Sequence, residues 1–130
     1  VESGLVTLTD NYVAGASRIS LPESFSWPIK TCNLKRCLLV TRFPLQDSEK
    51  ELVLINFHLE AYDSGEGKIA QSKMLADILE AEYEKGNYVI AGGDFNQTFE
   101  GVDKYPVTNK EDWAPGVIGT LMTPIPPAVF

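Results

Sequence analysis

In the second half of the chain, the apolar run Tyr88-Val89-Ile90-Ala91 leads directly into Gly92-Gly93-Asp94-Phe95-Asn96. The apolar run is typical of a buried strand, and the two glycines permit a tight turn or a close approach at its end. A carboxylate and a carboxamide, two residues apart, are then expected to point from the end of the strand into one space. Such a pair suits a phosphate group and a divalent metal ion.

An earlier apolar run, residues 52–57, ends at His58, the only histidine of the chain. Residues 68–85 lie between the two runs and predict a helix that ends at Gly86, a residue suited to a left-handed cap. A helix of this length between two strands favours a parallel crossover. Because parallel strands end at the same edge of a sheet, we expect His58 to meet Asp94 and Asn96 there, where ligands of such sheets bind.

The helix prediction rests on side chains that repeat at helical spacing. One face carries apolar residues and the other carries charged ones; the apolar set is Met74, Leu75, Ile78 and Leu79, and the charged set is Glu80, Glu82, Glu84 and Lys85. Further strands are expected at residues 5–9, 13–21 and 37–43, with a loop at 23–33 and a weak strand or turn within 112–120. The chain therefore reads as one α/β domain.

Composition bounds the function. The 130 residues suffice for one domain with a core, and no apolar run approaches the roughly 20 residues that span a bilayer. A net charge of −7 and the lack of a basic stretch interleaved with aromatics disfavour non-specific nucleic-acid binding. Acidic composition does not exclude a nucleic-acid enzyme, because local fields and bound metal matter more than the total charge. The sequence gives no compartment.

Each candidate residue also has a plain structural explanation. A single histidine after a strand is often a structural hydrogen-bonding group, and Gly-Asp-Phe-Asn alone could form a turn. Glu60, Tyr62 and Asp63 could form an ordinary polar loop. The functional interpretation gains weight because all of these residues are expected at the same rim of the sheet.

Two segments resemble a known family, the deoxyribonuclease I-like or endonuclease/exonuclease/phosphatase superfamily. The segment Asn56-Phe57-His58-Leu59-Glu60-Ala61 resembles the family's Asn-Thr-His-Leu-Asp-Ala motif, and Gly93-Asp94-Phe95-Asn96 is similar to its Gly-Asp-Phe-Asn motif. Residues 4–9 resemble a strand of the same family, and Arg36 falls where the family often carries a basic residue. The resemblance covers residues 4–105.

This resemblance implies a four-layer α/β/β/α sandwich with mainly antiparallel sheets and a divalent-metal-dependent phosphoesterase activity. His58 would be the catalytic histidine, Asp94 would activate water and bind Mg²⁺ or Mn²⁺, and Asn96 would bind a phosphate oxygen. Arg36, Tyr62 and Asp63 would contact the substrate, which could be a nucleic acid, a phosphoinositide or another phosphodiester.

The family's metal-binding Glu and its C-terminal Ser-Asp-His motif have no counterpart in this sequence. We therefore expect residues 1–130 to be the central part of such a domain, incomplete at both ends. Such a part should be inactive or weakly active alone and able to self-associate through open sheet edges. Two alternatives stay open: a non-catalytic binding or structural module on the same fold, and an unrelated α/β domain with two coincidental motifs.

Overall fold

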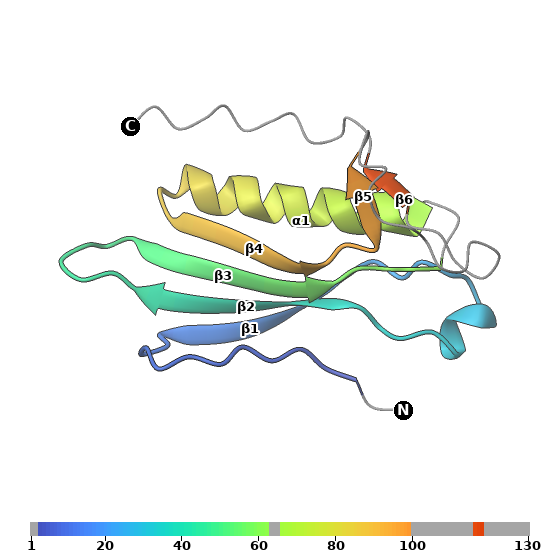
Figure 1. The fold of residues 1–130 in the computed structure, drawn as a ribbon, viewed down its shortest axis with the longest axis horizontal. Coiled ribbons are helices and arrows are strands. Elements are labelled where there is room, and N and C mark those ends of the chain that lie inside the picture. The colour runs from blue at the N-terminus through green and yellow to red at the C-terminus, as the bar shows by residue number, and fades with distance from the viewer. Residues whose placement is uncertain (1–2, 63–65, 100–115, 119–130) are drawn as a thin grey trace.

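The computed structural model describes residues 3–62, 66–99 and 116–118, and it confirms the α/β class (Figure 1). In chain order the elements are β1 (Gly15–Ser20), a short 3-10 helix (Ile29–Thr31), β2 (Cys37–Pro44), β3 (Glu51–His58), α1 (Glu66–Glu84), β4 (Tyr88–Asp94), β5 (Gln97–Phe99) and β6 (Gly116–Ile118).

Four strands form the main sheet, in the order β1-β2-β3-β4. β1 and β3 both pair antiparallel with β2, whereas β3 and β4 run parallel. The predicted crossover through α1 is therefore confirmed. β5 and β6 form a separate parallel pair. β6 lies within residues 112–120, where a weak strand or a turn is predicted, and the other residues of that range lie outside the described part of the chain.

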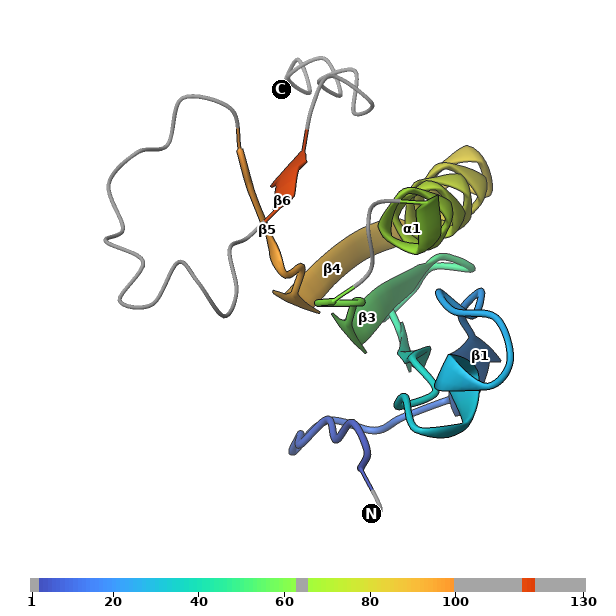
Figure 2. The same ribbon diagram turned by 90° about the vertical axis from the view of Figure 1, so that its right-hand side faces the viewer.

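The core lies between α1 and one face of the main sheet (Figure 2). Alternate residues of the central strands, among them Val40 on β2 and Ile55 on β3, are buried with Leu75 of the helix. Met74, Ile78 and Leu79 pack against this cluster, as their helical spacing predicts. Gly86 ends the helix with φ +81°, in the left-handed region expected of it.

The predicted strand at residues 5–9 is wrong. A strand needs a hydrogen-bonded neighbour, and this segment forms no ladder within the described residues. It runs along the face of the sheet opposite α1, where the Asn56 amide nitrogen donates to the Val6 carbonyl at 2.9 Å (Figure 2). Val6 and Leu8 remain 69% and 88% exposed, so the segment buries little of its apolar surface.

The described residues supply one helical layer on one main sheet of the predicted four-layer sandwich. On the edge strand β4, Tyr88 and Ile90 lie on the face away from the helix and are exposed. Across the described ranges, no helix is long and apolar enough to cross a membrane.

Glu82 corrects the predicted charged face of α1, because this side chain is buried, with 4% exposure. Its carboxylate accepts hydrogen bonds from the Arg42 guanidinium at 2.6 and 3.1 Å. It also accepts from the Lys85 ammonium at 2.9 Å and the Asn87 amide at 2.8 Å. These donors, Arg42 foremost, outweigh desolvation and lower the pKa of Glu82 to about 2.

Candidate functional site

The parallel register of β3 and β4 places His58 directly beside Asp94 at the carboxyl ends of the two strands. The imidazole Nε2 lies 3.6 Å from the Asp94 Oδ2, and the two side chains are 46% and 60% exposed. Solvent and a ligand can therefore reach both groups. The predicted meeting of the two motifs at one rim of the sheet is what the structure has.

Gly93 explains how the two strand ends come so close. A Cβ at this position would overlap the backbone carbonyl of Phe57 on β3, whereas a Cβ at Gly92 would meet open space. The close approach that the glycines suggested is thus an approach of the neighbouring strand, and Gly93 is the residue that permits it.

The turn after β4 ties the two motifs together. The backbone N–H of Asn96 donates to the Asp94 Oδ1 at 2.8 Å, and the Asn96 side-chain amide donates to the Leu59 carbonyl at 2.9 Å. The Leu59 N–H donates in turn to the Asp94 carbonyl at 2.8 Å. Asn96 adopts a left-handed conformation, with φ 50°, to complete this turn. One face of the turn is packed by an edge-to-face contact between Phe57 and Phe95, with ring centroids 4.6 Å apart.

A groove of about 610 Å³ opens beside His58, and we call it the basic groove. Its walls are formed by Ser3, Gly4, Leu5, Arg18, Asn33, Leu34, Lys35, Arg36, Cys37 and His58. Three of these residues are cationic and none is acidic, although the chain carries a net charge of −7. The groove therefore suits an anion.

Of the three cationic residues in the basic groove, Arg36 is predicted from the sequence, whereas Arg18 and Lys35 are not. Arg18 lies on β1 in register with Leu39, which is in register with Asn56 of β3. Since side chains alternate between the two faces of a sheet, Arg18, Asn56 and His58 share one face. The alternation was readable from the sequence, but the order of the strands was not.

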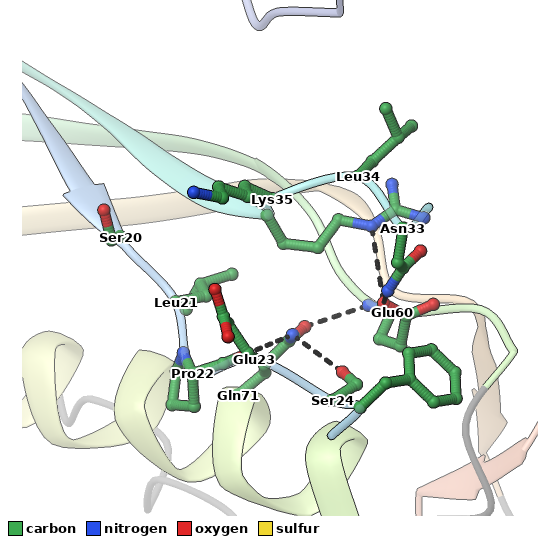
Figure 3. A pocket seen from close by; sticks show the side chains of 12 residues that line it. Ser20, Leu21, Pro22, Glu23, Ser24, Asn33, Leu34, Lys35, Glu60 and Gln71 are labelled. Atoms are coloured by element: carbon green, nitrogen blue, oxygen red, sulfur yellow. Dashed lines mark hydrogen bonds and ion pairs between the residues drawn. The ribbon is translucent and has the colours of Figure 1, made fainter. Parts of the chain in front are cut away.

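Glu60 is fully buried and belongs to no solvated loop (Figure 3). Burial raises the pKa of its carboxyl, but hydrogen bonds from Asn33 and from the backbone of Tyr62 and Ala61, with the charge of Arg36, outweigh burial and leave that pKa below its usual range. Glu60 is therefore an ionised group inside the protein, two residues after His58.

Two predicted contact residues add little to this geometry. Tyr62 is 71% exposed, and its side chain does not line the basic groove. Asp63 lies outside the described residues.

The predicted metal ion would need side chains that can act as its ligands. Within residues 3–62, 66–99 and 116–118, no group of three or more His, Cys, Asp or Glu side chains is placed to hold a metal. The described contacts of the Asp94 carboxylate are with the His58 imidazole at 3.6 Å and with the Asn96 backbone N–H at 2.8 Å. At this rim, Asp94 is the carboxylate that could serve as an oxygen ligand.

The chain is similar in structure to a solved human protein domain. The human Nocturnin catalytic domain, solved with a bound sulfate anion, superposes with a TM-score of 0.46 and 18% sequence identity. The superposition covers 65% of this chain and 30% of the Nocturnin chain. No protein-family profile matches the sequence, and no curated protein matches it either.

Proposed function

We propose that this chain binds a phosphate ester in the basic groove and contributes to its hydrolysis. The observation that carries the proposal is the in-register pairing of His58 with Asp94, 3.6 Å apart, at the mouth of a groove that holds three cationic residues. The resemblance of both segments to the endonuclease/exonuclease/phosphatase motifs supports the same chemistry.

In the proposed reaction, water attacks phosphorus, a new P–O bond forms, and the ester P–O bond breaks. Asp94 orients the water and accepts its proton, while His58 donates a proton to the leaving ester oxygen, which departs as an alcohol. Arg36 neutralises the phosphoryl charge. Asn96 has its amide committed to the Leu59 carbonyl, so we assign it to holding the turn and Asp94 in place.

Dependence on Mg²⁺ or Mn²⁺ is a separate part of the proposal. Asp94 offers one oxygen ligand, and Mg²⁺ sites often combine one or two carboxylates with oxygens of a bound phosphate. Turnover measured with Mg²⁺, with Mn²⁺ and with EDTA decides this part, and equal rates in all three would remove the metal from the proposal.

The experiment is a hydrolysis assay on the 130-residue chain with bis(4-nitrophenyl) phosphate, a DNA oligonucleotide and a phosphoinositide. Loss of a positioned acid–base group costs about 10²–10⁴-fold in rate, so His58→Asn should reduce any turnover by that factor. Lys73→Ala, a change on the exposed side of α1, is the control and should leave the rate unchanged. Equal turnover in His58→Asn would overturn the role of His58.

A second function, phosphate binding without turnover, is favoured by one observation: the described residues supply no cluster of metal ligands. It predicts that inorganic phosphate binds in the basic groove while every substrate in the assay stays intact. Circular dichroism on the same samples would establish that the chain is folded in that result.

A further inference from the structure

Glu60 makes more contacts than a loop carboxylate needs. Its Oε1 accepts the backbone N–H groups of Ala61 and Tyr62 at 2.9 and 3.1 Å. Its Oε2 accepts the Asn33 side-chain amide at 2.8 Å and lies 3.8 Å from the Arg36 Nε. One oxygen therefore holds the turn that follows His58, and the other holds the loop that carries Arg36.

The backbone of Glu60 is fixed as well. Its N–H donates to the Gln71 side-chain oxygen of α1 at 2.9 Å. The Gln71 amide nitrogen donates to the Pro22 carbonyl at 2.9 Å and to the Ser24 hydroxyl at 3.2 Å (Figure 3). Gln71 is itself buried, with 1% exposure. A buried polar network whose members all have partners favours one arrangement of the chain, because any shift leaves a group unpaired.

Arg36 forms an ion pair with Glu60 but has N–H donors without a described hydrogen-bond partner. Its side chain is 9% exposed, and its buried Nε has no hydrogen-bond partner. Within the described residues, the contact with Glu60 on the Nε side is its one ion pair. The same side chain lines the basic groove together with His58. A guanidinium carries five N–H donors, so its terminal amino groups stay available to a ligand with several oxygens.

We propose that Glu60 is a positioning residue: by holding the Nε side of Arg36 it directs the guanidinium into the basic groove for a phosphoryl oxyanion. This inference rests on the proposed anion binding of the groove, and it does not require that the chain hydrolyses anything. It adds a residue that acts on the ligand through Arg36 and not by contact.

Two roles of Glu60 predict opposite changes in phosphate affinity when the carboxylate is removed. A carboxylate beside Arg36 could compete with the anion for the guanidinium, and removing it would then strengthen binding. Positioning predicts weaker binding. In Glu60→Gln, the single amide oxygen can accept either from the backbone or from Asn33, so either the loop that carries Arg36 or the turn after His58 loses its hydrogen bonds, and the charge facing Arg36 is lost in both cases. Glu60→Asp keeps the charge but shortens the reach, which separates charge from position.

The experiment measures the affinity of the whole chain for inorganic phosphate by NMR titration. We expect Glu60→Gln and Glu60→Asp each to weaken phosphate binding by about fivefold to tenfold, the scale of one misaligned charge-assisted hydrogen bond. Arg36→Met should weaken it at least as much. In the Arg36→Met background, Glu60→Gln should cost less than about twofold further, because residues that act as one unit are not additive.

Glu82→Gln is the matched control, since it neutralises the other buried carboxylate that forms an ion pair with an arginine, and it should leave the phosphate affinity within about twofold. If Glu60→Gln does not fold, Asn33→Ala removes one donor to the Glu60 carboxylate, and we expect about threefold weaker binding.

Three outcomes would overturn the inference: no phosphate binding by the wild-type chain, unchanged or tighter binding in Glu60→Gln and Glu60→Asp, or a full loss on top of Arg36→Met. Phosphate binding with the expected losses but no hydrolysis of any ester would support the inference while the proposed hydrolytic function fails.

Discussion

Two buried glutamates form ion pairs with arginines at opposite ends of the main sheet, and the two pairs differ in geometry. At the end away from the rim, Glu82 takes both terminal nitrogens of Arg42, which also donates to Glu51. At the rim, the Glu60 carboxylate lies 3.8 Å from the Nε of Arg36. It accepts its hydrogen bonds from the Asn33 amide and from the backbone that follows His58.

This difference separates stability from binding. Arg42 donates three hydrogen bonds through both terminal nitrogens to Glu82 on α1 and Glu51 on β3, so it joins the helix to the sheet. An arginine that is held on one side only, as at Glu60, costs the fold an unpaired donor and keeps hydrogen-bonding capacity for something that enters the groove. The end of the sheet with the incomplete pair is also the end with the exposed histidine and aspartate.

The largest loss of stability is expected for a substitution at the rim end of the main sheet. In Gly93→Ala, the new Cβ overlaps the Phe57 carbonyl, so β4 must move away from β3. We expect a loss of about 3 kcal/mol or more in the free energy of unfolding, the upper range for overpacking. Urea denaturation measures it. Gly92→Ala, where the space is open, is the matched control, and similar losses in both variants would contradict the role assigned to Gly93.

A slightly smaller effect is expected at the distal end. Glu82→Gln replaces a buried carboxylate by a neutral acceptor for Arg42, whose side chain is 31% exposed and still pairs with Glu51, and we expect a loss of about 3 kcal/mol of unfolding free energy, the lower end for breaking a buried pair. Glu84→Gln, two residues along α1 on an exposed side chain, should change stability by less than about 0.5 kcal/mol. Equal stability of the two variants in urea denaturation would show that the hydrogen bonds of Glu82 with Arg42, Lys85 and Asn87 do not stabilise the fold.

Acid should weaken the same cluster in a defined window. The pKa of Glu82 falls from 4.5 to about 2 on folding, so its contribution is complete above pH 4.5 and declines as the pH falls toward 2. By pH 3 about 2 kcal/mol of it should be gone. The stability gap between wild type and Glu82→Gln, measured by urea denaturation at pH 7 and pH 3, should therefore shrink. If the stability difference is the same at pH 7 and pH 3, the ionisation of Glu82 is not responsible for the loss of stability in acid.

The smallest effect sharpens the contrast between two glycines. Gly86 ends α1 with φ +81°, but its surroundings hold only the flexible Lys50 side chain. Gly86→Ala should cost only the backbone strain, about 1 kcal/mol, which thermal denaturation can resolve. A loss as large as that of Gly93→Ala would mean that conformation and not close approach limits both positions.

The sequence predicted what depends on local periodicity. The helix follows from its apolar spacing, the two flanking strands from their apolar runs and the cap from the glycine at position 86, and these elements suffice to bring His58 and Asp94 to one edge. The meeting of these two residues was predictable because a parallel crossover fixes which strand ends coincide.

The arginine partners were not predictable in this way. Glu82 lies among exposed acids on α1, and its partner Arg42 lies 40 positions earlier on β2. Glu60 and Asn33 are 27 positions apart. Nothing in the local pattern distinguishes a buried carboxylate from its solvated neighbours until the sheet order is known. The same lack of long-range information produced the wrong strand prediction at residues 5–9, which have no ladder partner among the described strands.

The pairing of His58 with Asp94 is set by the register of β3 and β4 and not by the length of chain between them. Residues gained or lost in the connection would leave the two side chains beside each other as long as the ladder keeps its register. The spacing between the two motifs is therefore free to change during evolution. Related chains should be sought by the two motifs in order, with a helix between them, and not by a fixed number of intervening residues.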